Sequence, residues 1–216
     1  MTPNHVLLRD GSEVVIRQIE NGDAPLLADG FARLSNESRR LRFLTGKPNL
    51  TPAELLYFTD VDHHDHEALG AMSPLDGRGL GIARYIRHAE DLGGAEIAVT
   101  VIDEWQRRGL ATELLSRLAD RGRQEGIRHF TALVAVDNAA VGGMLHDIRT
   151  GVRIVHSESG TAEYEITLPP RGLGEGLQAL LRAFGRRQLK VPVSIRGALA
   201  ALTPEGFTDL GPGSGS

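Results

Sequence analysis

Hydrophobic and polar positions in the first sixty residues predict one strand followed by two helices. Residues 13–19 (EVVIRQI) alternate with the period of two that a half-buried β-strand shows. Residues 21–23 (NGD) predict a turn whose aspartate caps a helix, and the helical pattern continues to residue 42. Residues 51–54 (TPAE) predict the second helix start, because they supply a cap, a proline in the first turn and an acid at the third position.

The middle of the chain changes to a pattern of strands around one strong helix. Residues 67–72 and 79–88 predict two strands joined by a polar turn, and residues 95–103 (AEIAVTVID) predict a third. Leucines recur every four residues over 109–125, which predicts an amphipathic helix. Residues 129–136 (HFTALVAV) form the unbroken apolar run that is typical of a buried parallel strand.

The remaining segments complete a mixed α/β (α+β) fold. A weaker helix is predicted over 139–147, and residues 152–159 and 161–169 predict a hairpin. The order β-α-α-β-β-β-α-β-α-β-β indicates a mixed central sheet flanked by helices. Prolines and a glycine after residue 168 predict a boundary, with one domain over 1–170. Residues 171–216 are then an extension that carries a short amphipathic helix and a disordered tail.

Composition restricts the class of protein. The 216 residues are 41% hydrophobic and 24% charged, as in a soluble globular protein. The absence of cysteine excludes disulfides, thiolate metal sites and a cysteine nucleophile, and it fits a cytoplasmic location. The net charge of −4 argues against a dedicated nucleic-acid binder. No apolar run approaches the length of a membrane span, and the first residues lack the layout of a secretory signal.

The strongest chemical signal is the passage from strand to helix at residues 96–112. Small residues in the first helical turn let a ligand approach backbone amides that have no partner within the helix. Those amides and the helix dipole form an anion site, and Arg107 and Arg108 add positive charge beside it. An ordinary strand-to-helix turn containing Gly109 is the alternative, and local physics alone gives the two about equal weight.

In this strand–helix context, residues 106–111 (QRRGLA) match the motif Q/R-x-x-G-x-G/A, and the chain resembles the GNAT superfamily of N-acetyltransferases over about residues 14–168. The segments SNESRRLRFL, LTPAELLYFTDVD and GIARYIR also resemble its bacterial protein-lysine acetyltransferase branch. This resemblance implies acetyl-CoA as co-substrate. It also implies a primary amine as the acceptor, which in that branch is a protein lysine. The amine attacks the thioester directly in a ternary complex.

The resemblance implies a cofactor site made of backbone groups. The backbone of Val99, Thr100 and Val101 pairs with the pantetheine arm as if the arm were another strand. Asn138 matches an asparagine that often contacts the pantetheine, and no metal site is implied. The CoA pyrophosphate is held by the amides of Arg107, Arg108, Gly109, Leu110, Ala111 and Thr112.

The resemblance also implies a general base. An ammonium group must lose a proton before it attacks a thioester, and Glu96, in an A-E-I context, matches the glutamate that accepts it in lysine acetyltransferases. A surface glutamate at a strand start is the alternative. A strand amide near Val101 would stabilise the oxyanion.

The position of the family's general acid is not filled by its usual residue. A tyrosine often lies seven residues after the asparagine and protonates the leaving thiolate, but here that position is Leu145. Tyr85, Tyr164 and His146 are the candidate substitutes, but a structural role is favoured for each of them. CoA thiolate is also a fair leaving group without an acid.

Other signals leave alternatives open. Residues 60–66 (DVDHHDH) contain metal-ligand types, but adjacent residues rarely converge on one ion, so a loop between helix and strand is expected. A small-molecule amine acetyltransferase and a catalytically silent acyl-CoA-binding module are the alternative functions. The acceptor, the acyl chain length and the oligomeric state stay open, and an oligomer is compatible with the sequence.

Overall fold

A mixed sheet of eight strands, in the order β1-β2-β3-β4-β5-β6-β8-β7, organises the protein. The computed structural model describes residues 4–43, 48–135, 151–158 and 161–185. The strands are β1 (Asn4–Leu7), β2 (Glu13–Gln18), β3 (His66–Met72), β4 (Gly79–Arg87), β5 (Gly94–Val101), β6 (His129–Ala135), β7 (Val152–Glu158) and β8 (Thr161–Thr167). The helices are η1 (Asn21–Asp23), α1 (Ala24–Ala32), α2 (Asn36–Phe43), α3 (Pro52–Thr59), η2 (Asp103–Trp105), α4 (Leu110–Gln124) and α6 (Gly174–Gly185).

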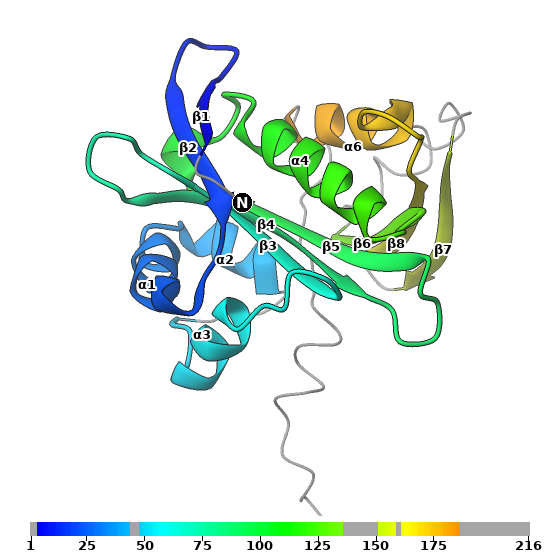
Figure 1. The fold of residues 1–216 in the computed structure, drawn as a ribbon, viewed down its shortest axis with the longest axis horizontal. Helices are drawn as coiled ribbons and strands as arrows, with labels where there is room; N and C mark the ends of the chain where they lie inside the picture. The colour runs from blue at the N-terminus through cyan, green and yellow to red at the C-terminus, as the bar shows by residue number, and fades with distance from the viewer. Residues whose placement is uncertain (1–3, 44–47, 136–150, 159–160, 186–216) are drawn as a thin grey trace, which may run out of the picture.

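Helices cover both faces of the sheet. In Figure 1, α1, α2 and α3 lie on one side of it, and α4 and α6 lie on the other. The predicted mixed central sheet flanked by helices is therefore confirmed. The predicted helix at 139–147 lies outside the described residues.

The leucine stripe of α4 forms the centre of the core. Leu110, Leu114 and Leu118 are 1%, 0% and 0% exposed, and they join the core cluster that contains Leu69 of β3 and Ile97 of β5. Full burial of one such side chain stabilises a fold by about 1.5–3 kcal/mol. This stripe therefore fixes α4, and with it the preceding turn, against β5.

Two local elements differ from the prediction. Residues 4–7 form an additional strand, β1, which pairs with β2 at the sheet edge and is mostly exposed, so no burial pattern marks it. The continuous helix predicted up to residue 42 is two helices. The break occurs at Ser35, whose N–H and hydroxyl both donate to the Asp103 carboxylate at 2.9 Å, and the Ser38 hydroxyl donates to the same group. A bond across 68 residues has no local sequence signal.

Among the strands that the structure describes, β5 and β6 form the one parallel pair, and it is short. Only Gly94–Glu96 pair with His129–Thr131, after which β6 continues alongside β8 alone. From Ile97 to Val101, β5 has a partner strand only on its β4 side within the described ranges. One edge of β5 is therefore open in the middle of the sheet.

The helix predicted beyond residue 170 packs against the same core. Leu173 and Leu177 are 7% and 2% exposed and belong to the cluster that α4 centres. The α6 helix carrying Leu177 contacts β8 and α4. The domain boundary near 170 stays a prediction.

Residues 60–65 of the polar segment form the predicted loop, His66 begins β3, and hydrogen bonds hold the loop in place. Asp62 accepts the backbone N–H groups of His64, Asp65 and His66. Behind the loop lies Glu67, which is 0% exposed. Its carboxylate bonds Arg121 of α4 at 2.9 Å and Gln18 of β2 at 2.9 Å. It also contacts the Nδ1 of His63 at 2.8 Å, so one buried carboxylate links the loop to β2 and α4.

We expect Glu67→Gln to lower the free energy of unfolding by about 2 kcal/mol, since hydrogen bonds from a guanidinium to a carboxylate are worth more than those to an amide. Urea unfolding followed by circular dichroism measures the change. Glu125→Gln is the matched control, because Glu125 also pairs with Arg121 but is partly exposed, whereas Glu67 is fully buried. A loss at Glu125 as large as at Glu67 would contradict the anchoring role of Glu67.

Candidate functional site

Along β5, the backbone N–H and C=O groups of successive residues point alternately toward β4 and toward the open edge. Ile102 N donates to Leu80 O and His88 N donates to Gly94 O, so the even-numbered residues of β5 bond β4. Backbone groups of alternate strand residues point to opposite edges. Val99 and Val101 therefore direct their N–H and C=O groups toward the open edge. Thr100 directs its backbone groups toward β4, so the structure separates the three residues that the sequence grouped.

The turn after β5 folds back onto the strand. The amide of Gln106 donates through Nε2 to the carbonyl of Val101 at 3.1 Å. Arg107 and Gly109 both have positive φ, 65° and 92°. The positive φ at Gly109 favours glycine, and successive amides in such a turn form a concave anion-binding nest.

The start of α4 completes this anion site. Glu113 N makes the first bond within the helix, to Gly109 O at 3.0 Å. The N–H groups of Leu110, Ala111 and Thr112 come before it, so they have no carbonyl partner within the helix. The predicted pyrophosphate-binding segment 107–112 is thus one continuous turn beside the open edge of β5.

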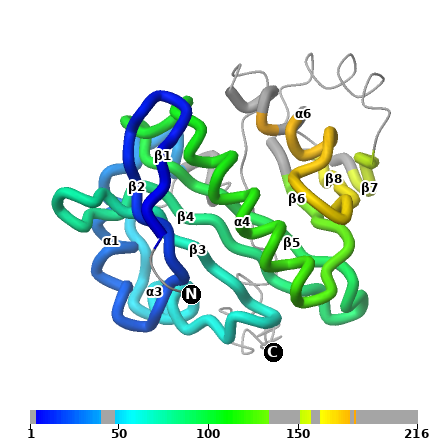
Figure 2. The backbone as a smooth tube through the Cα atoms, turned by 45° about the horizontal axis from the view of Figure 1, so that its top comes forward, coloured from blue at the N-terminus to red at the C-terminus, as the bar shows by residue number. Residues whose placement is uncertain are grey.

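Three arginines surround this turn and have different roles. Arg108 lies over the Trp105 ring at 4.8 Å and donates to Ser12 Oγ at 3.3 Å, so it joins the β1–β2 turn to the loop. Arg107 is exposed. Arg9 was missed by sequence reasoning because β1 was missed. Its side chain lies 3.7 Å from where a Cβ on Gly109 would be, and Figure 2 shows the β1–β2 hairpin beside the start of α4.

Glu96 lies where β5 and β6 separate. It pairs with Ile86 of β4 and with Thr131 of β6, the last pair between those two strands. It is half-buried, on the sheet face that carries α1 and α3. Burial raises the pKa of the Tyr57 hydroxyl of α3, and the negative charge of Glu96 adds to that rise. Tyr57, another residue that the sequence did not indicate, thus lies within electrostatic range of Glu96.

The candidate acids named from sequence lie elsewhere. Tyr85 is 0% exposed and donates its hydroxyl to the carbonyl of His64, and burial raises its pKa strongly. Tyr164 is 1% exposed in the core cluster on the α4 side of the sheet. Neither shares a sheet face with Glu96. Asn138, Leu145 and His146 lie outside the described residues.

An acidic surface of β6 and β8 continues from Glu96. Thr131 pairs with Glu165, and Leu133 pairs with Glu163, so both glutamates lie on the same face as Glu96. Arg153 binds Glu165 through two bonds of 2.8 Å, which lowers the pKa of that carboxyl. Asp91 lies 3.2 Å from His129 beside them. These carboxylates thus make the surface negative, and the Arg153 guanidinium offsets part of their charge.

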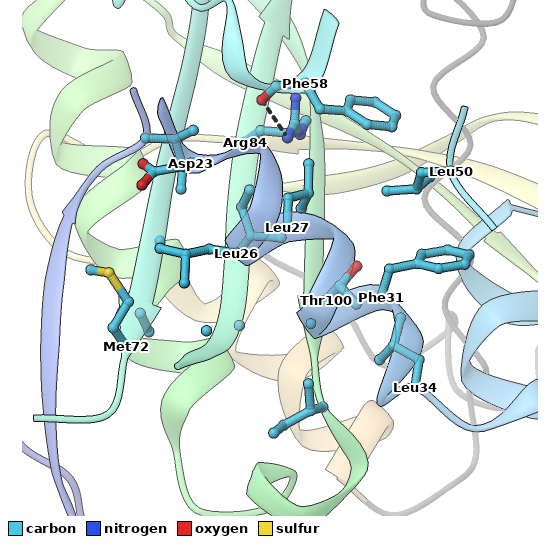
Figure 3. A pocket seen from close by; sticks show the side chains of 18 residues that line it. Asp23, Leu26, Leu27, Phe31, Leu34, Leu50, Phe58, Met72, Arg84 and Thr100 are labelled. Atoms are coloured by element: carbon cyan, nitrogen blue, oxygen red, sulfur yellow. Dashed lines mark hydrogen bonds between the residues drawn. The ribbon is translucent and has the colours of Figure 1, made fainter. Parts of the chain in front are cut away.

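An apolar cavity lies on this same face, between α1, α3 and strands β3 to β5. Leu27, Phe31 and Phe58 line it together with Thr100 of β5, as Figure 3 shows. It holds roughly 740 Å³ of space, the part open to solvent included. Thr100 Oγ1 is buried and makes no hydrogen bond with any part of the chain that the structure describes.

Metal and membrane features are absent from the described parts. In the ranges given above, no cluster of three or more His, Asp or Glu residues could hold a metal ion. None of the helices within those ranges is both long enough and apolar enough to cross a membrane.

Comparison with known proteins identifies the family. Residues 33–146 match the model of the acetyltransferase (GNAT) family. The chain is 31% identical to the acetyltransferase Pat of Mycolicibacterium smegmatis over 79% of this chain and 50% of Pat, so it spans about half the length of that relative. It is 36% identical to the acetyltransferase PA5475 of Pseudomonas aeruginosa, over 62% of this chain and 70% of that protein.

A solved structure agrees with the sequence relatives. The GNAT domain of S. lividans PAT is similar with a TM-score of 0.66 and 31% identity, over 77% of this chain and 97% of that domain. The resemblance to this superfamily and to its bacterial acetyltransferases is confirmed. The chain therefore belongs to the acetyltransferase (GNAT) family.

Proposed function

We propose that this chain transfers an acetyl group from acetyl-CoA to a primary amine, with a protein lysine side chain as the acceptor. The observation that carries the proposal is the position of Glu96, which ends the β5–β6 pairing and shares a face with an acidic surface. A carboxylate at this point can accept the proton that an ammonium group must lose before it attacks.

The donor fits the open edge of β5 and the turn that follows. The pantetheine arm adds to the edge through Val99 and Val101, as an extra strand does. The pyrophosphate takes the amides of residues 107–112, where the helix dipole favours an anion. Arg107 and Arg9 supply positive charge there, and Asn138 stays a predicted contact.

The acceptor approaches over the face of β6 and β8. A lysine is cationic at neutral pH, and the negative potential of Glu96, Glu163, Glu165 and Asp91 attracts it. By contrast, His66 beside Arg84 adds no charge, because burial and the Arg84 guanidinium lower its pKa to about 4. A polyamine carries the same charge as a lysine-rich segment, so the choice between them needs experiment.

The reaction needs no covalent enzyme intermediate. Glu96, directly or through water, removes a proton from the ammonium, and the free amine attacks the thioester carbonyl. The C–S bond then breaks to release CoA thiolate, and the nitrogen passes its second proton to the thiolate or to solvent. A backbone amide of β5 near Val101 stabilises the oxyanion. Both substrates must be bound together for this step. Initial rates at varied concentrations of both substrates should therefore give intersecting lines in a double-reciprocal plot, whereas parallel lines indicate a covalent intermediate.

An acceptor screen tests the proposal. Thiol release from acetyl-CoA is measured with lysine-bearing peptides, with polyamines and without acceptor. We expect release only with an amine, fastest with the peptides, and acetyl-lysine in the peptides by mass spectrometry. Faster release with polyamines supports a small-molecule amine acetyltransferase. CoA binding without any release supports a silent acyl-CoA-binding module instead.

A further inference from the structure

The cavity beneath α1 has walls that suit an aliphatic ligand. Leu27, Phe31, Phe58 and Ile82 line it together with glycines from α1, β3 and β4. Its charged lining residues have partners within the protein. Asp23 is paired with Arg17 through two bonds of 2.6 Å. Arg84 donates to the carbonyl of Phe58 and lies over the Phe58 ring at 4.5 Å. Apart from the buried Thr100 hydroxyl, the remaining side chains of the lining offer apolar contact.

The cavity also lies beside the path of the thioester. Glu96 and Thr100 are four residues apart on one strand, so their side chains share a face, about 13 Å apart along the strand. Thr100 lines the cavity, and the open edge of β5 runs between the two residues. A thioester carbonyl that is attacked near Glu96 therefore lies on the same face of the sheet as the cavity.

We propose that the cavity receives the aliphatic part of an acyl group longer than acetyl, so that the protein uses medium-chain acyl-CoA donors. This inference rests on the proposed function. From Thr100 of β5 to Met72 of β3 the cavity crosses two strand spacings, about 10 Å, which leaves room for several carbons in an extended chain. A lysine side chain suits the apolar walls poorly, since its ammonium group would have to leave water beside the Arg84 guanidinium.

A donor series tests the inference. KM for acetyl-, butyryl- and hexanoyl-CoA is measured by thiol release with one lysine peptide. We expect KM to fall about fourfold for each added methylene that the cavity buries, since burial contributes about 0.8 kcal/mol per methylene. Turnover of acetyl-CoA with no turnover of the longer donors would overturn the inference and leave the proposed function standing.

A cavity-filling variant locates the effect. Gly30 of α1 lines the cavity, and a Cβ there meets nothing within 4 Å, so the side chain introduced by Gly30→Leu starts into open space beside the cavity. It also replaces a glycine in a helix, where leucine is the better helix former. We expect unchanged KM for acetyl-CoA and a loss of the tenfold or greater preference for longer donors. Ala32→Leu, on the exposed side of the same helix, is the control that keeps the preference.

A binding measurement keeps the test independent of turnover. Calorimetry with S-methyl-, S-butyl- and S-hexyl-CoA thioethers reports affinity even if no acceptor is turned over. Affinity that rises with chain length in the wild type and not in Gly30→Leu supports the inference. Equal affinity for all three thioethers would overturn the inference. Slower acetyl transfer in Gly30→Leu with the donor preference unchanged would also overturn it, because the acceptor and not the acyl chain would then occupy the cavity.

Discussion

The Glu96→Gln variant is expected to lose between about 100-fold and 10,000-fold in kcat/KM for amine acetylation at neutral pH. The amide has the size of the carboxylate but cannot accept a proton from the ammonium. The deficit should shrink as the pH rises toward the pKa of a free lysine, about 10.4, because more of the acceptor is already neutral. Thiol-release assays from pH 7 to pH 10 measure both effects.

Two controls make that result specific to Glu96. Affinity for CoA should stay at the wild-type value, because Glu96 lies at the opposite end of β5 from the turn at 106–109. Glu90→Gln in the exposed β4–β5 loop removes the same charge and should leave the kinetics unchanged. If Glu96→Gln matches the wild type at every pH, another group is the base.

The Ala111→Asp variant is expected to weaken CoA binding by about 100-fold or more. Ala111 is the second residue of α4, where the pyrophosphate would accept backbone N–H groups. Two like charges a few ångströms apart near a surface repel by about 4 kcal/mol. The same aspartate interacts favourably with the helix dipole, so the fold should not weaken by this route. Calorimetric titration with CoA measures the affinity, and urea unfolding measures the stability.

The matched control is Ala53→Asp, at the second position of α3. It adds the same charge at the same helical position, on an exposed residue away from the turn, and should leave CoA affinity unchanged. An unchanged affinity in Ala111→Asp would show that CoA does not use the start of α4. Equal losses in both variants would point to a general charge effect.

The sequence predicted those parts of the fold whose signal is local and long. The leucine stripe of α4 has a clear helical period and the apolar run of β6 is unbroken, and the structure contains both elements. The cap at the start of α3 was also predictable, because Thr51 and Glu54 reciprocate their hydrogen bonds within one turn. In each case the residues that determine the element lie within the element.

Features that depend on distant partners were not predictable. β1 is a strand because β2 lies beside it, and its four residues have no pattern of their own. The break before α2 depends on Asp103, which lies 68 residues from Ser35. The same limit applies to the site. The alternation of β5 could be read from sequence, but which edge is open depends on where β6 ends its pairing.

The bond between Ser35 and Asp103 has a consequence for how the two substrates affect each other. Asp103 opens η2, the segment that leads into the turn at 106–109, while Ser35 precedes α2. Burial opposes the charge of Asp103, but bonds from Ser35 and Ser38 prevail and lower its pKa, so the link persists at neutral pH. If CoA binding at the turn tightens this link, then order in α2 must in return favour CoA binding by the same free energy, because linkage is reciprocal.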